Sequence, residues 1–175
     1  MAYKQQKFAI SIPKNLDATK RQLLAREVID FIVERTQNGM DKNNESFKKA
    51  YNTKSGNYSK GYKNSLDYSI AGKSDKIDLT LSGDMLADLS MVDDRPGKMV
   101  IGYHRGYSDM GKVEGNVLGT YGQSSPVSPP RDFLGITQQD LERIVSKYKE
   151  FPLEESVIQG YAEDVLNLFD FEEIE

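Results

Sequence analysis

Residues 106–112 have the spacing of a phosphate-binding loop. They read Gly-Tyr-Ser-Asp-Met-Gly-Lys and match the nucleotide-binding P-loop up to its lysine. The next residue is Val113, at the position where that loop needs a hydroxyl group to hold Mg²⁺. Gly115 and Gly119 then fall in the stretch that should form the helix whose N–H groups bind the phosphates, and glycine disfavours helices. We therefore expect no nucleotide site in this segment.

The other residues with catalytic or metal-binding potential stand apart from one another. His104 is the single histidine; it could serve as a general base, but no residue marks itself as a nucleophile for it to activate. Asp41, Asn43 and Glu45 alternate like the start of a calcium loop, but the glycine and the final glutamate of that loop are missing. We interpret His104 as a surface or packed side chain. The sequence therefore predicts a protein that is not an enzyme and that takes no cofactor and no metal.

The composition favours a single domain made in a reducing compartment. The chain has 175 residues, a net charge of −4 and no cysteine, which excludes disulfides and zinc–thiolate sites. It contains no apolar run close to the ~20 residues that span a bilayer, and its first residues are too polar for a signal peptide. We expect a cytoplasmic site of synthesis and no membrane partner.

Residues 40–76 differ from the rest because lysine and tyrosine alternate there with Ser, Asn and Gly. Few aliphatic residues are present, so we expect a long mobile loop, with a short helix possible over 45–51. Lysines beside aromatic rings are also used to bind single-stranded nucleic acid. Residues 42–76 could thus be a nucleic-acid site or a solvated assembly loop. The candidate residues are Lys54, Lys60, Lys63, Tyr58 and Tyr62.

Residues 127–148 predict an extended segment that leads directly into a helix. Pro129 and Pro130 restrict the backbone to extended conformations, and Thr137 with Asp140 has the spacing of a capping box. An apolar helical face then follows, and it consists of Leu141, Ile144, Val145 and Tyr148. Between the prolines and the cap lie the candidate anchor residues Arg131, Phe133 and Leu134.

The N-terminal part predicts a strand followed by the longest helix. Alternation over 7–12 indicates a strand with Phe8, Ile10 and Ile12 on one side. A helix is expected over 18–38, with Asp17 as its N-cap and Gly39 as its stop. Its apolar stripe consists of Leu24, Val28, Phe31, Ile32 and Arg35, widened by Leu23 and Ile29.

The middle of the chain predicts three strands and a short helix. We expect strands over 77–81, 91–94 and 98–103, with a turn at 95–97. Ser82 should cap a short helix over 83–89. Residues 104–128 are rich in glycine and show no clear period, so we expect a long loop there, with one hairpin possible.

Residues 150–175 predict a second C-terminal helix with a broad apolar face. All of its charges are negative: Glu150, Glu154, Glu155, Glu163, Asp164, Asp170, Glu172, Glu173 and Glu175. This acidic surface could be a solvated helix face, or it could meet the lysine-rich loop of a neighbouring copy.

Together these elements predict an α+β fold. It has a long N-terminal helix, a small mainly antiparallel sheet, two long loops and two C-terminal helices. We expect one domain over residues 1–150, with a mobile loop at 40–76, and an acidic helix over 151–175 that packs on it or extends from it.

Three blocks of the sequence resemble the virion morphogenesis family of tailed phages, the tail-completion or neck proteins. The block PPRDFLGI over 129–136 is similar to the family's PxRxFLGL segment. In the family it is preceded by LTLTG-x-L-x-x-S and then by V-x-I-G; here 79–90 reads LTLSGDMLADLS and 99–103 reads MVIGY. The blocks occur in the family's order and cover about residues 77–148. Ser82 replaces the usual threonine.

The resemblance implies a structural virion protein and no cofactor. Such a protein is assembled in the host cytoplasm and forms a ring at the head–tail junction. It would contact other copies of itself, as a hexamer, and the connector or adaptor on one side. On the other side it would contact the tail terminator or tail tube, with genomic DNA passing through the lumen. The resemblance does not distinguish tail completion from tail terminator or adaptor.

Overall fold

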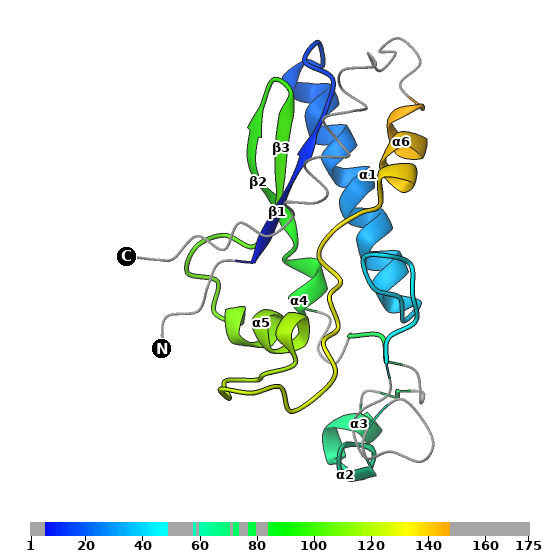
Figure 1. Ribbon diagram of the computed structural model, residues 1–175, viewed down its shortest axis with the longest axis vertical. Helices are drawn as coiled ribbons and strands as arrows, with labels where there is room; N and C mark the ends of the chain where they lie inside the picture. Colours follow the sequence, from blue (N-terminus) through cyan, green and yellow to red (C-terminus); the bar gives the residue numbers. More distant parts are fainter. Residues whose placement is uncertain are drawn as a thin grey trace.

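The computed structural model describes residues 6–48, 58, 60–70, 72–73, 77–79 and 84–147 (Figure 1). Some expectations therefore concern residues outside these ranges. They are the role of Lys54, the cap at Ser82, the end of the apolar helix face at Tyr148 and the second C-terminal helix, together with the ends of the helix at 45–51 and the strand at 77–81 and much of the mobile loop at 40–76.

Three antiparallel strands form one sheet in the order β1-β3-β2. They are β1 (Lys7–Ser11), β2 (Ser90–Arg95) and β3 (Lys98–Gly102). In the register of β1 with β3, Phe8 lies opposite Ile101, and both are buried because every second residue faces the core. The turn between β2 and β3 has Gly97 at φ 88°, a conformation that glycine adopts at little cost. These strands and their turn confirm the prediction.

Helix α1 (Ala18–Gln37) is the long helix that the sequence predicts. Asp17 caps it by accepting a hydrogen bond from the third backbone N–H that follows, and Gly39 ends it with φ 78°. The inclusion of Leu23 in its apolar face is wrong: this side chain is 51% exposed, since the core lies against the opposite side of the helix. The buried residues of α1 are Leu24, Ala25, Val28, Ile32, Arg35 and Thr36.

The remaining helices are short. They are α2 (Lys60–Lys63), α3 (Leu66–Ile70), α4 (Asp84–Ala87), α5 (Met110–Leu118) and α6 (Gln138–Val145). Helix α1 packs against α6, β2 and β3, while α2 and α3 contact each other at the lower end of the molecule in Figure 1. The fold is α+β, as predicted, with the expected first C-terminal helix at α6.

The prediction of a loop over 104–128 is wrong, because α5 occupies part of it. Two glycines in this stretch have a low helix propensity, but one of them allows close packing of a ring and the other ends the helix. Gly115 lies under the Tyr121 ring, where a Cβ atom would come within 2.6 Å of the ring. Gly119 ends the helix in the left-handed conformation at φ 72°.

Two smaller predictions are also wrong within the described residues. Residues 77–79 are not a strand; Leu79 has φ 55°, which breaks the extended conformation. Residues 45–48 are not helical, because Ser46 pairs in an isolated bridge with Met40 and thereby closes a tight loop after α1.

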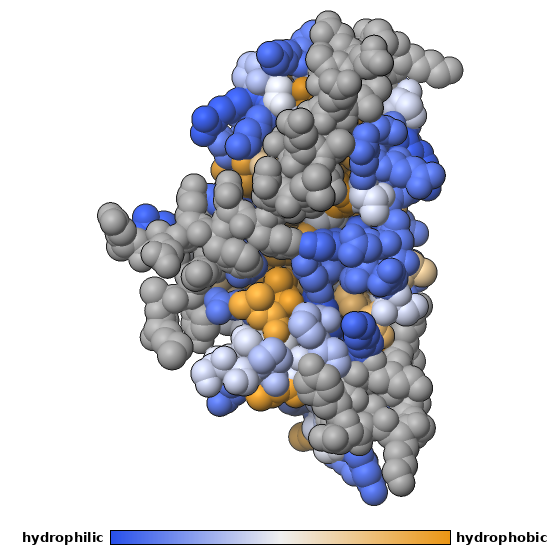
Figure 2. All heavy atoms as spheres, viewed as in Figure 1, coloured by the Kyte–Doolittle hydropathy of each residue, from blue (hydrophilic) through white to orange (hydrophobic). Residues whose placement is uncertain are grey.

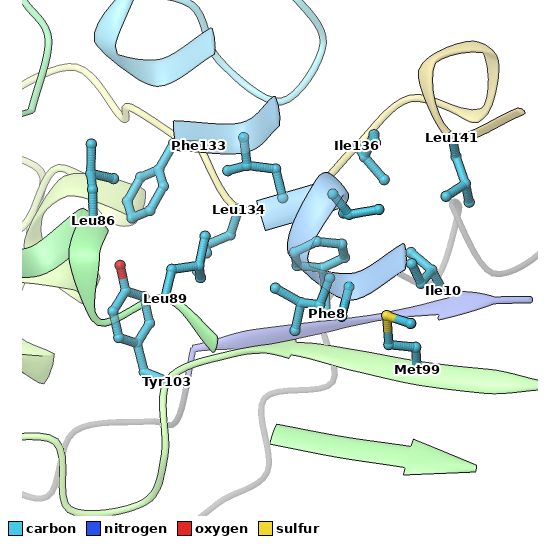
Figure 3. Packing of buried hydrophobic residues seen from close by; sticks show 14 of the residues in the cluster. Phe8, Ile10, Leu86, Leu89, Met99, Tyr103, Phe133, Leu134, Ile136 and Leu141 are labelled. Atoms are coloured by element: carbon cyan, nitrogen blue, oxygen red, sulfur yellow. The ribbon is translucent and has the colours of Figure 1, made fainter. Parts of the chain in front are cut away.

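One apolar core joins the sheet, α1 and the segments after α5. Figure 3 shows Phe8, Ile10 and Met99 over the sheet, with Phe133 beside Leu86. Outside this core, Figure 2 shows a mainly hydrophilic surface over α1 and α6 and apolar atoms beside α5.

Candidate functional site

The candidate site is the extended segment 129–137, which we call the strap. It runs from the end of α5, alongside α1, to the start of α6 (Figure 1). The residues just before the strap are tied to the C-cap of α5 by the backbone: Val127 N and Ser128 N donate to the Gly119 carbonyl oxygen at 2.8 and 3.1 Å. Arg131 N donates to the Asn116 carbonyl oxygen at 2.7 Å. The strap therefore satisfies carbonyl groups that the end of α5 leaves free.

Phe133 and Leu134 anchor the strap in the core. Both side chains are fully buried, at 0% exposure, and Ile136 beyond them is 3% exposed. In Figure 3 Phe133 lies beside Leu86 of α4, and Ile136 lies near Leu141 of α6. Burial of a Phe or Leu side chain stabilises a fold by about 1.5–3 kcal/mol, so these side chains hold the strap in place. Burial is what an anchor role for Phe133 and Leu134 requires.

Arg35 of α1 binds the strap backbone from the other side. Its Nη2 donates to the carbonyl oxygens of Phe133 and Gly135 at 2.7 and 2.9 Å, and its Nη1 donates to the Lys42 carbonyl oxygen at 3.3 Å. Its side chain also lies over the Phe31 ring. Burial lowers the pKa of Arg35 to about 10, because desolvation disfavours the charged form. Arg35 is 4% exposed and is thus a buried cation whose partners are mainly carbonyl groups.

The loop that follows α1 is joined to the strap at Asp132. Lys42 N donates to the Asp132 carbonyl oxygen at 2.8 Å, and Lys42 Nζ pairs with Asp132 Oδ2 at 2.8 Å. Burial raises the pKa of the Asp132 carboxyl, and the hydrogen bond from Lys42 opposes that effect. Further along, Asn44 Nδ2 donates to Asp140 Oδ2 at 2.7 Å. The loop after α1 is therefore bound to the strap and to the first turn of α6.

Arg131, the third candidate anchor residue, is buried at the lower end of the strap. It is 7% exposed, and its Nη1 donates to the Tyr121 hydroxyl at 3.4 Å. That hydroxyl also bonds Asn116 Oδ1 at 2.5 Å. Burial raises the pKa of Tyr121, and the Arg131 charge opposes the shift. Arg131 thus connects the strap to α5 through a tyrosine.

Thr137 ends the strap and begins α6. Its Oγ1 accepts a hydrogen bond from Asp140 N at 3.2 Å and donates to Asp140 Oδ2 at 2.6 Å. This cap confirms the spacing noted in the sequence, and it determines the residue at which α6 begins.

The lysine–tyrosine candidates lie in a different part of the molecule. Tyr58 and Tyr62 come together with Tyr68, their ring centroids 5.0 to 5.8 Å apart. Tyr58 is 8% exposed, and its hydroxyl donates to Asp78 Oδ1 at 3.3 Å. Lys60 is exposed and Lys63 half-buried, both on α2. The structure thus groups these residues, although the tyrosine rings pack on one another.

No protein family, curated protein or solved structure was found to match this chain. The site is therefore interpreted from its own geometry and from the sequence blocks described above.

The structure places the residues with catalytic or metal-binding potential as follows. His104 is exposed after the end of β3, and Lys112 of the P-loop-like segment donates to Asp109 at 2.9 Å. In the described part of the chain, no three acidic or histidine side chains gather as a metal site would require. Within the same part, none of the helices is both long and apolar enough to cross a bilayer.

Sequence reasoning missed three residues of the site, which are Arg35, Lys42 and Gly119. Arg35 did carry a signal, since a cation on the apolar stripe of α1 must be buried with acceptors or must leave the stripe. No local pattern marks Lys42, because its partner Asp132 is distant in sequence, and none marks the bond of Gly119 with Ser128, which precedes the strap.

Proposed function

We propose that this chain is a structural virion protein of a tailed phage, located at the head–tail junction. It would form a ring, as a tail-completion or neck protein does, and join the tail to the connector. The observation that supports the proposal is that the described residues of the three sequence blocks resembling that family meet in one packed unit.

The contacts between the blocks are specific. Tyr103, from the block at 99–103, is fully buried and donates its hydroxyl hydrogen to the Met85 carbonyl oxygen of the first block at 2.6 Å. Phe133 of the third block lies beside Leu86 of the first. Residues that pack on one another are constrained together, so such blocks are expected to recur as a set in proteins that share this core.

The partners of the buried polar side chains also support a structural role. Arg35, Arg131 and Asp132 bind neighbouring backbone or side-chain groups of the same chain, where an enzyme would direct such groups towards a substrate. The strap thereby fixes α6 and the loop after α1 as a rigid surface. Rigid surfaces suit assembly with copies of the same chain, with the connector or adaptor and with the tail terminator or tail tube.

The test is electron microscopy of a lysate in which this gene is inactivated in the phage or prophage that carries it. We expect filled heads and complete tails lying apart, with infectivity restored by the purified protein. The matched control is the same purified chain carrying Phe133→Ala, which should not restore infectivity. Attached, infectious particles in the absence of the gene would contradict the proposal.

Among the described residues of 42–76, the geometry does not favour the alternative of single-stranded nucleic-acid binding. A base-stacking groove needs exposed ring faces, whereas Tyr58 is buried and Tyr62 and Tyr68 pack on it. We therefore propose the virion role alone.

A further inference from the structure

Helices α1 and α6 lie side by side and run in opposite directions (Figure 1). Two side-chain contacts give their register. The Arg143 guanidinium lies over the Phe31 ring, 5.4 Å from its centroid, and Lys147 Nζ pairs with Glu27 Oε2 at 3.0 Å. A step of four residues forward from α6 therefore matches a step of four residues backward along α1. Because helical residues all advance by the same ~1.5 Å, this register continues as long as the chain coils.

The next position in this register on α1 is Leu23. It lies four residues before Glu27, on the same row of the helix. Among the residues of α1, all of which are described, it is the one large hydrophobic side chain that is exposed, at 51%. Phe31 and Arg35 continue this row, and they contact Arg143 of α6 and the strap. Leu23 therefore extends a line of contacts towards the chain that follows Lys147.

The matching position beyond Lys147 is Phe151. At the end of the described segment the backbone still coils, since Lys147 N donates to the Ile144 carbonyl oxygen at 3.2 Å. Pro152 disfavours helical backbone at the residue before it, so Phe151 is about the last residue that the coil can include. One further turn brings Phe151 opposite Leu23. The register thus pairs an exposed apolar side chain with an aromatic one.

The charges that follow Phe151 fit the same placement. Beyond the Asp17 cap, the first turn of α1 has no acidic residue, although the helix dipole places a partial positive charge there. Glu154 and Glu155 come three and four residues after Phe151, so a chain that runs on along α1 brings them towards that turn. Carboxylates near a helix N-terminus are stabilising. The segment therefore offers an apolar residue and then acidic residues, in the order in which α1 can bind them.

We propose that residues 148–155 pack on the N-terminal half of α1 of the same chain, with Phe151 on Leu23 and with Glu154 and Glu155 near the first turn. The same chain is the occupant because only four residues separate Phe151 from Lys147, which is itself bound to α1. So short a connection gives the segment a high effective concentration at Leu23. The proposal goes beyond the head–tail role and does not depend on it.

The first experiment is disulfide cross-linking, for which the chain is suited because it has no cysteine. The test variant carries Leu23→Cys with Phe151→Cys. The matched control carries Leu66→Cys with Phe151→Cys, because Leu66 is also exposed, at 73%, but lies on α3 at the lower end of the molecule in Figure 1. Under mild oxidation the test pair should form a disulfide within one chain at least about tenfold faster than the control pair. Peptide mass spectrometry identifies the bond, and circular dichroism should show the same fold in both variants.

The dependence on concentration distinguishes the same chain from a neighbouring copy. Cross-linking within one chain should proceed at a rate that does not change on dilution, and non-reducing electrophoresis should show a monomer. An equal mixture of the two single variants, Leu23→Cys and Phe151→Cys, should form cross-linked dimers more slowly, and more slowly still on dilution.

A tryptophan reports the same contact without a covalent bond. The chain has no tryptophan, so Phe151→Trp introduces a single emitter. Adding Leu23→Ser to this variant should move the emission to longer wavelength, because the indole loses its apolar neighbour and meets water. Adding Val127→Ser should leave the emission unchanged, since Val127 is exposed to a similar extent, at 53%, but precedes the strap.

Each result supports or overturns the proposal. Fast cross-linking within one chain and a wavelength shift specific to Leu23→Ser support it. Cross-linking no faster than in the control pair, disulfides that form only between chains, or an emission that Leu23→Ser leaves unchanged would each overturn it. None of these results alters the head–tail role, which the lysate experiment tests separately.

Discussion

Arg35 and Phe133 are joined by a hydrogen bond of 2.7 Å from a guanidinium nitrogen to a main-chain oxygen, across 98 positions of sequence. The same guanidinium binds Gly135 and Lys42, so one side chain of α1 holds both the strap and the loop that follows the helix. This bond explains why the strap lies along α1.

Arg35→Ala should lower the free energy of unfolding by about 2–4 kcal/mol, because it leaves buried carbonyl groups without donors. Arg35→Lys should cost less, since the ammonium keeps the charge but reaches fewer of the oxygens. Urea titration followed by circular dichroism measures both. Arg26→Ala, on the exposed side of α1, should change stability by about 0.5 kcal/mol or less. If Arg26→Ala and Arg35→Ala lowered the free energy of unfolding equally, Arg35 would not be the residue that holds the strap.

Phe133→Ala should cost about 3–5 kcal/mol, the usual range for truncating a fully buried aromatic residue. The yield of soluble, folded protein should fall together with the stability, and assembly should be lost. Thermal melting and yield are the measurements, and Val127→Ala in the exposed approach to the strap serves as control. An unchanged melting temperature together with normal assembly would show that Phe133 is not the anchor.

Gly119→Ala should destabilise the protein more than Gly106→Ala. Both glycines have positive φ, 72° and 84°, which costs another residue about 1–2 kcal/mol. A Cβ atom at Gly106 meets open space, whereas at Gly119 it collides with the Ser128 carbonyl group of the chain leading to the strap. Chemical denaturation of the two variants gives the comparison. Equal losses would indicate that only backbone strain matters at Gly119.

The Asp132→Asn variant tests the raised pKa of the buried carboxyl group through the pH dependence of stability. Burial raises the pKa of Asp132 above its ordinary value of 3.8, so the folded state takes up this proton at a higher pH than the unfolded state. Its contribution to stability is therefore fully present below pH 3.8 and is lost as pH rises through the folded pKa. Relative to Asp132→Asn, wild type should gain stability as pH falls from neutral towards 3.8. A difference that is constant with pH, or that reverses, would contradict the shift.

The helix start sites could be predicted because their signals are local. Asp17 and Thr137 each bond a backbone N–H three residues away, so spacing alone identifies them. The alternation in 7–12 likewise predicts β1, since one side of a strand must face the core. Helix α5 was missed because Gly115 has a low helix propensity, and only the Tyr121 ring packed above it explains why a glycine is there.

The sequence by itself determined the α+β class, the long capped helix, the hairpin of β2 and β3, and the capped start of α6. Each follows from periodicity, capping or turn chemistry within a short window. Only the tertiary structure decided that Arg35 binds the strap, that Lys42 pairs with Asp132, and that Leu66 and Ile70 are exposed. The reason is physical: a buried cation or carboxylate is stabilised by partners distant in sequence, and exposure depends on everything that packs nearby.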